Sequence, residues 1–210
     1  MKAPPGYLLI IEDDPDILKL LETTLMFKGY RVMTARNGNE GLEVIQKERP
    51  AIVIADIMMP KLDGFGLVHR LRIHPETRDI PVVFITATYV ASEDREFALK
   101  IGATQFIQKP IDLDGFLKTI AKLLEQGVPV VLEPLKEFNF YDEYRKRLEA
   151  KLEQKTVQIA RDERLLETAF SEEEHQSLHA SLRHAVSERE ELRLLLDEIH
   201  EQLKKYAKSE

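Results

Sequence analysis

Five apolar, strand-like runs alternate with amphipathic helical stretches between residues 7 and 126, and this alternation constrains the fold more than any other feature. The expected strands are Tyr7–Ile11, Tyr30–Ala35, Ala51–Ala55, Pro81–Thr86 and Thr104–Ile107. Three of the helical stretches are followed by a glycine, which is a common helix stop. Five such units in a row predict an α/β fold, a doubly wound parallel sheet with helices on both faces and right-handed crossovers.

The pattern changes at Gly127, which divides the chain into three parts. Residues 1–126 form the expected sheet domain, and residues 127–134, which contain two prolines, are interpreted as an extended linker. Residues 135–210 contain no Gly or Pro and have the composition of long helices. Ser171 followed by Glu174 matches a capping box, so we expect two helices, at about 135–169 and 172–207.

Each of the two expected helices carries one apolar seam. The seam of the second helix is regular, whereas Arg145, Lys155 and Asp162 interrupt that of the first. A single helix cannot bury its own stripe, so the helices pair with each other, with a second copy of the chain as a homodimer, or with another protein. The interrupted seam favours a hairpin or bundle over a long two-stranded coiled coil.

Composition excludes several classes of site and partner. With no cysteine, the chain has no disulfide, thiolate metal site or cysteine nucleophile. A formal net charge of −7 disfavours binding to nucleic acid. The sequence shows neither a signal peptide nor an apolar stretch of membrane-spanning length. We therefore expect a soluble cytoplasmic protein with no membrane or nucleic-acid partner.

Polar side chains follow four of the five expected strands at their carboxyl ends. Glu12 and Asp13 follow the first strand, Asp56 the third, Thr86 ends the fourth and Lys109 follows the fifth. In the strand order 2-1-3-4-5 these four strand ends are neighbours, at the edge where open α/β sheets bind ligands. A cluster of carboxylates is costly unless a cation lies within it. The sequence therefore predicts a cation-dependent site at this edge.

Four stretches of the chain resemble the receiver domain of two-component response regulators. They are IIEDDP at 10–15, IADIMMPKLDG at 54–64, VFITA at 83–87 and GATQFIQKP at 102–110. The resemblance covers residues 7 to 126, with the stretches in the right order and spacing. It implies a flavodoxin-like receiver fold with a five-stranded parallel sheet of order 2-1-3-4-5.

The resemblance also assigns roles to the residues at the strand ends. It implies that Asp56 accepts a phosphoryl group from a phosphohistidine, and that Mg²⁺ is bound by Asp13, Asp56 and the backbone carbonyl of Met58. Glu12 would act through metal-bound water. Oxygen ligands of this kind suit Mg²⁺, which offsets the repulsion between a carboxylate and a phosphoryl group.

The remaining family positions concern the phosphoryl group and the conformational switch. The resemblance implies that Lys109 and Thr86 stabilise the phosphoryl oxygens, and that Pro110 follows a cis peptide bond that turns Lys109 inward. Thr86 and the aromatic Phe106 would form the switch, with Phe106 rotating inward once Thr86 moves. The protein would then be a signalling phosphoacceptor and not an enzyme.

Three functions remain open for the whole chain. In the first, a sensor histidine kinase or phosphotransfer protein phosphorylates Asp56, and this controls a helical output region that does not bind DNA and whose target is unknown. In the second, the tail is a histidine phosphotransfer module in a phosphorelay, an idea suggested by His184 and His200; His175 and His179, four residues apart, could instead present two metal ligands on one helix face. In the third, the chain is a structural adaptor that works independently of phosphorylation.

Overall fold

The computed structural model describes residues 6–86, 92–126, 136–168 and 171–207. The chain divides into two compact units, Met1–Leu135 and Lys136–Glu210. The linker expected at 127–134 lies outside the described residues. No helix within the described ranges is both long enough and apolar enough to cross a membrane.

The first unit contains a five-stranded parallel sheet in the order β2-β1-β3-β4-β5. Its strands are β1 (Leu8–Ile11), β2 (Val32–Ala35), β3 (Ile52–Asp56), β4 (Val82–Thr86) and β5 (Gln105–Gln108). β1, β3 and β4 are buried along their whole lengths, as the continuous apolar runs in the sequence predicted. The predicted fold class is thereby confirmed, with each strand boundary shifted by at most two residues.

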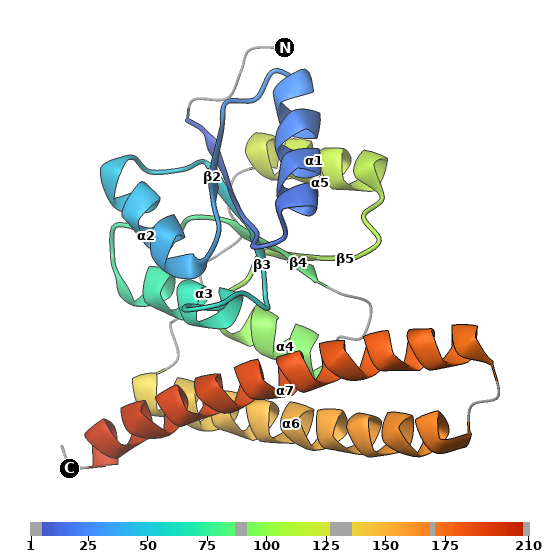
Figure 1. Ribbon diagram of the computed structural model, residues 1–210. Helices are drawn as coiled ribbons and strands as arrows, with labels where there is room; N and C mark the ends of the chain where they lie inside the picture. The colour runs from blue at the N-terminus through green and yellow to red at the C-terminus, as the bar shows by residue number, and fades with distance from the viewer. Residues whose placement is uncertain (1–5, 87–91, 127–135, 169–170, 208–210) are drawn as a thin grey trace. The chain divides into compact units, whose positions relative to one another are not determined.

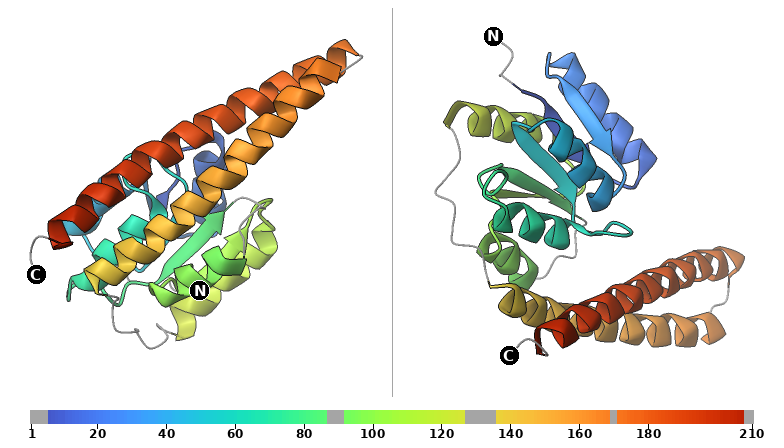
Figure 2. Two further views of the ribbon diagram at one scale, coloured as in Figure 1. Left: turned by 90° about the horizontal axis from the view of Figure 1, so that it is seen from below. Right: turned by 90° about the vertical axis from the view of Figure 1, so that its left-hand side faces the viewer.

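Helices cover both faces of the sheet: α1 and α5 lie on one face, and α2, α3 and α4 lie on the other (Figures 1 and 2). Their bounds are α1 (Pro15–Phe27), α2 (Gly38–Lys47), α3 (Gly64–Ile73), α4 (Ser92–Lys100) and α5 (Leu113–Gln126). Alternate residues of each central strand point to opposite faces. Leu8, Ile10, Ile52 and Ile54 therefore share one core cluster with Phe116 of α5.

The second unit is a pair of long helices, α6 (Glu137–Thr168) and α7 (Glu172–Ala207), which pack against each other within one chain. The predicted capping box is present at the start of α7. The Glu174 N–H donates to Ser171 Oγ at 3.2 Å, and the Ser171 N–H donates to Glu174 Oε2 at 3.4 Å. These bonds satisfy donors that have no partner inside the helix.

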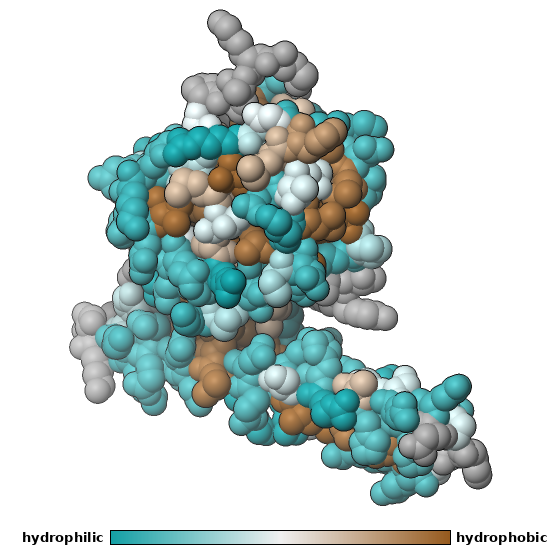
Figure 3. Space-filling view, turned by 45° about the horizontal axis from the view of Figure 1, so that its top comes forward, coloured by the Kyte–Doolittle hydropathy of each residue, from teal (hydrophilic) through white to brown (hydrophobic). Residues whose placement is uncertain are grey.

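The seam between α6 and α7 combines apolar layers with polar ones. Its buried residues include Leu148 and Ile159 of α6 and Ala185, Leu192 and Ile199 of α7. Between these layers, Lys155 and Glu188 form an ion pair at 2.6 Å, and the Ser181 hydroxyl donates to Asp162 at 2.9 Å. Two of the polar residues that interrupt the seam of the first helix, Lys155 and Asp162, thus meet polar partners across the hairpin, whereas Arg145 pairs with Asp142 and Glu149 of α6 itself. The visible surface of the hairpin is mostly hydrophilic, with smaller hydrophobic patches (Figure 3).

Candidate functional site

Two neighbouring strands deliver three carboxylates to one spot at the carboxyl edge of the sheet. Ile11 of β1 pairs with Ala55 of β3, so the next residues, Glu12 after β1 and Asp56 at the end of β3, lie at the same level of the carboxyl edge. Together with Asp13 they place one carboxylate oxygen each within 4.8 Å of one another. The grouping predicted from the strand ends is therefore present in the folded chain.

Two adjacent aspartates in the loop after β1 have different positions. The Asp14 carboxylate caps α1 and accepts hydrogen bonds from the N–H groups of Asp16 at 2.9 Å and Ile17 at 3.1 Å. Asp13, one residue earlier, belongs to the carboxylate group. The cap fixes where the helix begins, and with it the loop that carries Asp13.

Lys109 brings a positive charge into this group from the loop after β5. Its Nζ lies 2.5 Å from Asp56 Oδ2 and 3.0 and 3.2 Å from the two carboxylate oxygens of Glu12. The Lys109 N–H donates to the carbonyl of Thr86 at 2.7 Å, and the Lys109–Pro110 peptide bond is cis. The lysine therefore bridges the ends of β1 and β3 while its own backbone is fastened to the end of β4.

Burial makes the electrostatics of this group unusual. The Glu12 residue is only 1% exposed, and burial together with the nearby charge of Asp56 raises its pKa to about 7 in spite of Lys109. Burial likewise raises the pKa of Asp13. For Lys109, burial acts to lower the pKa, but the hydrogen bonds and charges of Asp56 and Glu12 outweigh it and raise the pKa. The lysine is thus held in its charged form, while the carboxylates carry more negative charge than it neutralises.

The donor set fits a hard divalent cation. Glu12, Asp13 and Asp56 offer only carboxylate oxygens, and the chain has no thiolate that would favour a softer metal. A cation among them would also offset the excess negative charge. Residues and geometry at this edge of the sheet are therefore those expected of a Mg²⁺ site.

The loop between β3 and α3 holds Asp56 in place through close backbone contacts. The Met58 N–H donates to Asp56 Oδ1 at 3.1 Å, and the Gly64 N–H donates to the carbonyl of Ile57 at 2.8 Å. A Cβ atom at Gly64 would lie 2.5 Å from the Asp56 carbonyl oxygen, closer than real Cβ atoms approach. The side chain of Asp63 accepts from the Gly66 N–H at 2.8 Å and caps α3.

Thr86 and Phe106, the expected switch residues, lie on adjacent strands. Thr86 ends β4 and is 3% exposed, and it pairs in register with Gln108 of β5. Phe106 is half-buried on β5, with its ring centre 6.3 Å from that of Phe84 in an edge-to-face arrangement. Phe84 in turn contacts Phe65 of α3, whose ring also contacts Phe97 of α4. Phe106 therefore belongs to a row of rings that runs from β5 to α3 and α4.

Sequence reasoning did not find the role of Arg72, which comes from α3 and is 4% exposed. Its Nε and one terminal nitrogen donate to the carbonyl of Gly102 at 3.1 and 2.7 Å, and burial lowers its pKa to about 10. This contact fastens α3 to the turn before β5. Of the two residues, only Gly102 stood out in the sequence, as a glycine that ends a helix. Its positive φ of 99° agrees with that position.

The tail histidines lie along α7. The rings of His175 and His179 are 6.2 Å apart, His184 lies 3.7 Å from Glu188, and His200 lies 3.9 Å from Glu149. Within the described part of the chain, three or more side chains that could bind a metal ion come together at Glu12, Asp13 and Asp56, and not at these histidines. The helix thus spreads these histidines along its length.

Comparisons with known proteins agree with this geometry. Residues 8–121 match the family described as response regulator receiver domain. The chain is 37% identical over 130 residues to the probable transcriptional regulator ycf27 of Pyropia yezoensis, an alignment that covers 58% of this chain and 52% of that protein. It is 36% identical over 138 residues to the transcriptional regulatory protein GlrR of Escherichia coli K12, which covers 65% of this chain and 30% of that protein.

A solved structure is similar over its whole length. It is a putative response regulator from Chloroflexus aurantiacus, with 32% sequence identity, a TM-score of 0.54, and coverage of 58% of this chain and 98% of that one. The chain spans about half or less of the length of the two curated relatives. The family match extends over more than half of the 210 residues and includes Glu12, Asp13, Asp56, Thr86 and Lys109. The chain therefore belongs to the response regulator receiver family.

Proposed function

We propose that this protein is a two-component response regulator that accepts a phosphoryl group on Asp56 from a sensor histidine kinase or a phosphotransfer protein. The observation that carries the proposal is the contact of Lys109 with both Asp56 and Glu12, beside Asp13, at the carboxyl edge of the sheet. Phosphorylation of an aspartate is general in this family. Asp56 is the aspartate at the centre of this contact.

The chemistry assigned to Asp56 is a phosphoryl transfer. A carboxylate oxygen of Asp56 forms a bond to phosphorus, the bond between phosphorus and the donor imidazole nitrogen breaks, and the imidazole leaves. Mg²⁺, held by Asp13, Asp56 and the Met58 carbonyl, with Glu12 acting through water, supplies charge neutralisation when bound. Lys109 stabilises the phosphoryl oxygens as a point charge.

The switch assigned to Thr86 and Phe106 converts this chemistry into a change of surface. A phosphoryl group adds about −1.5 to −2 charge at neutral pH, together with strong acceptor oxygens. The Thr86 hydroxyl turns toward them, and Phe106 rotates inward against Phe84. Because Phe84 contacts Phe65, and Phe65 contacts Phe97, the rotation reaches α4 through packed rings. The face altered is that of α4, β5 and α5.

The output assigned to the second unit is a rearrangement of helices, without DNA binding or an enzymatic reaction. Residues 136–210 carry 14 Lys and Arg against 18 Asp and Glu, a formal charge of −4. A DNA-reading helix is typically basic and belongs to a short helix-turn-helix, whereas α6 and α7 are long and uniform. The two curated relatives have names that describe transcriptional regulators, but their alignments cover only part of their own length. The proposed location is the cytoplasm, where sensor kinases present their phosphohistidine.

The acceptor is tested with acetyl phosphate and Mg²⁺ as phosphodonor system and intact mass as readout. The full-length protein gains one phosphoryl group, Asp56→Asn gains none, and Asp16→Asn, a change at an exposed position on α1, behaves as the wild type. A phosphorylated Asp56→Asn variant would contradict the assignment of the acceptor. Transfer of the phosphoryl group to a base-stable, acid-labile form in the tail would instead support the phosphorelay. Binding of the phosphorylated protein to DNA would contradict the assigned output.

A further inference from the structure

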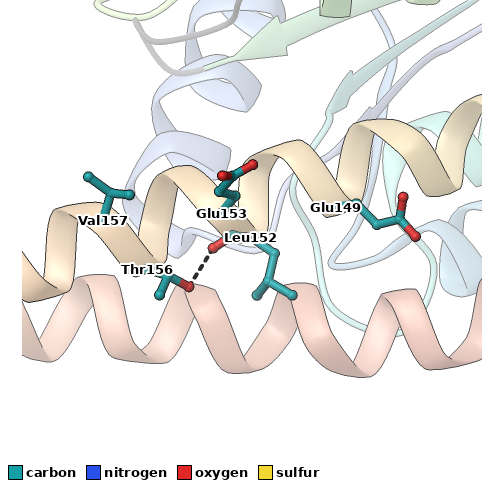
Figure 4. Close-up of a pocket in the computed structure, with 5 residues that line it drawn as sticks. All are labelled: Glu149, Leu152, Glu153, Thr156 and Val157. Carbon is teal, nitrogen blue, oxygen red and sulfur yellow. Dashed lines mark hydrogen bonds between the residues drawn. The ribbon is translucent and has the colours of Figure 1, made fainter.

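The side of α6 turned away from α7 carries a stripe of residues that the hairpin does not bury. We define the α6 outer stripe by its members: Glu149, Glu153, Val157, Arg161, Arg164 and Leu165. Most of them are spaced four residues apart, over a length of about 24 Å, and each step of four advances about 40° around the helix. The row therefore crosses the outer side of α6 obliquely, with Glu153, Val157, Arg161 and Arg164 near its middle. Glu149, at one end, lies on the flank, 3.9 Å from His200 of α7. Figure 4 shows Glu153 and Val157 on the side of α6 away from α7, and Leu152 pointing toward α7.

The stripe is apolar at its centre and open to solvent. Val157 is 65% exposed and Leu165 is 47% exposed. Two shallow hollows lie along this side of the helix. One is lined by Glu149, Leu152, Glu153, Thr156 and Val157, and the other by Val157, Ala160, Arg161, Arg164 and Leu165. The two hollows meet at Val157, which is therefore the midpoint of the surface.

Charge is distributed with opposite sign on the two sides of Val157. Glu149 and Glu153 precede it, and Arg161 and Arg164 follow it. Within the described residues, neither the Glu153 carboxylate nor the Arg164 guanidinium has an ion-pair partner. Arg161 donates to Asp162 with two of its nitrogens and remains 67% exposed. Glu149 pairs with Arg145 of the same helix at 2.9 Å and remains 43% exposed. One half of the stripe thus complements the other half.

A surface of this kind is complementary to itself under a two-fold rotation. We propose that the α6 outer stripe binds the same stripe of a second copy of this chain, with the two α6 helices antiparallel and the two-fold axis at Val157. Val157 then packs on Val157. Glu153, four residues before the axis, faces Arg161 of the second copy, four residues after it, and Glu149 lies beside Arg164 of the second copy. Two hairpins joined in this way form a four-helix arrangement.

The order of charges selects this arrangement over a parallel one. With parallel α6 helices, each residue would face its own counterpart, so Glu153 would oppose Glu153 and Arg161 would oppose Arg161. Like charges in contact are destabilising, whereas the antiparallel arrangement makes four attractive pairs around one apolar centre. The surface lies wholly within α6, and the inference goes beyond the proposed phosphoryl chemistry and does not depend on it.

Sedimentation of the full-length chain over a range of concentrations tests the association. The wild type shows a monomer–dimer equilibrium, and Val157→Glu weakens it by more than about tenfold, because a carboxylate would be buried against its own copy. Leu194→Glu is the matched control, since Leu194 of α7 is 64% exposed and lies outside the stripe. A wild type that stays monomeric, or a dimer lost in Leu194→Glu and kept in Val157→Glu, overturns the proposal.

Charge exchange tests the antiparallel register. Glu153→Arg and Arg161→Glu each place like charges opposite one another, and each alone weakens dimerisation roughly tenfold. Mixed in equal amounts, the two variants form a heterodimer in which both contacts are again attractive, so the dimer returns. Failure of the mixture to associate, with both variants helical by circular dichroism, overturns the register. Because Arg161 also binds Asp162, Glu149→Arg with Arg164→Glu provides a second complementary pair that leaves this contact intact. Glu149→Arg gives up the ion pair with Arg145, so Glu149→Gln, which loses that pair without adding a positive charge, is its control.

Discussion

The Lys109 ammonium lies 2.5 Å from the Asp56 carboxylate, although Asp56 ends β3 and Lys109 follows β5, two strands that are not adjacent in the sheet. Glu12 completes the bridge at 3.0 Å. One lysine therefore offsets part of the charge of a buried carboxylate group, which makes the region sensitive to any change in its cations.

Replacing Lys109 by Met removes this positive charge. We expect the free energy of unfolding to fall by about 2–4 kcal/mol in Mg²⁺-free buffer near pH 7, because the loss of one partner leaves buried carboxylates uncompensated. Urea unfolding measures the change. Lys19→Met is the control: its ion pair with Glu22 leaves the lysine side chain 74% exposed, and its loss costs less than about 1 kcal/mol. Equal losses in the two variants would show that Lys109 does not compensate this group.

Magnesium is expected to stabilise the folded protein. At a concentration about a hundred times its dissociation constant, a ligand that binds only the folded state adds about 2.7 kcal/mol to the free energy of unfolding. Asp13→Asn removes a metal ligand, so the gain on adding Mg²⁺ shrinks, while stability without Mg²⁺ rises because one repelling charge is gone. Thermal unfolding with and without Mg²⁺ measures both effects. Asp16→Asn should respond to Mg²⁺ as the wild type does, and an undiminished gain in Asp13→Asn would exclude Asp13 as a ligand.

The contact between Arg72 and Gly102 predicts that Gly102→Ala is more harmful than Gly29→Ala. Both glycines have positive φ, at 99° and 84°, so both substitutions introduce backbone strain of about 1 kcal/mol. A Cβ at Gly102 would also lie 2.7 Å from Arg72 Nε, whereas one at Gly29 would meet nothing within 4 Å. We expect Gly102→Ala to cost at least about 1–2 kcal/mol more, because the buried guanidinium must give up its acceptor. Equal melting temperatures for the two variants would contradict this reading.

The buried Asp162 in the hairpin predicts a pH dependence of the second unit. Burial acts to raise the pKa of Asp162, but the hydrogen bonds from Ser181 and Arg161 outweigh it and hold the pKa below the ordinary value of 3.8. A depressed carboxylate pKa contributes stability that is present above 3.8 and is lost as the pH falls through the folded-state pKa.

Asp162→Asn should therefore lower the free energy of unfolding of the helical unit by about 1–2 kcal/mol at pH 7. The difference from the wild type should shrink as the pH falls below 3.8 and through the lower folded-state pKa, at which the wild-type carboxylate becomes protonated. Urea titrations followed by far-ultraviolet circular dichroism measure both values. Asp197→Asn, at an exposed position on α7, is the control and should change little at either pH. A difference that is independent of pH would show that the charge of Asp162 does not contribute.

Local pattern determined much of this protein. The apolar runs and helical spacings predicted five strands and the helices between them, because the period of apolar residues reports which faces are buried. The strand ends predicted that Glu12, Asp13, Asp56 and Lys109 would meet, because parallel strands present their carboxyl ends on one edge. The capping box at Ser171 and Glu174 located the start of α7, because a cap is a contact between residues close in sequence.

Only the tertiary structure decided the contacts that depend on packing between distant segments. It showed that Asp13 joins the carboxylates, that Arg72 holds Gly102, and that Asp162 meets Ser181 across the hairpin. The two residues of each long-range pair lie far apart in the chain, so no periodicity in the sequence links them. These contacts depend on how helices pack against a sheet or against each other. Side-chain shape and buried polar groups then select one packing register from several that have the same apolar pattern.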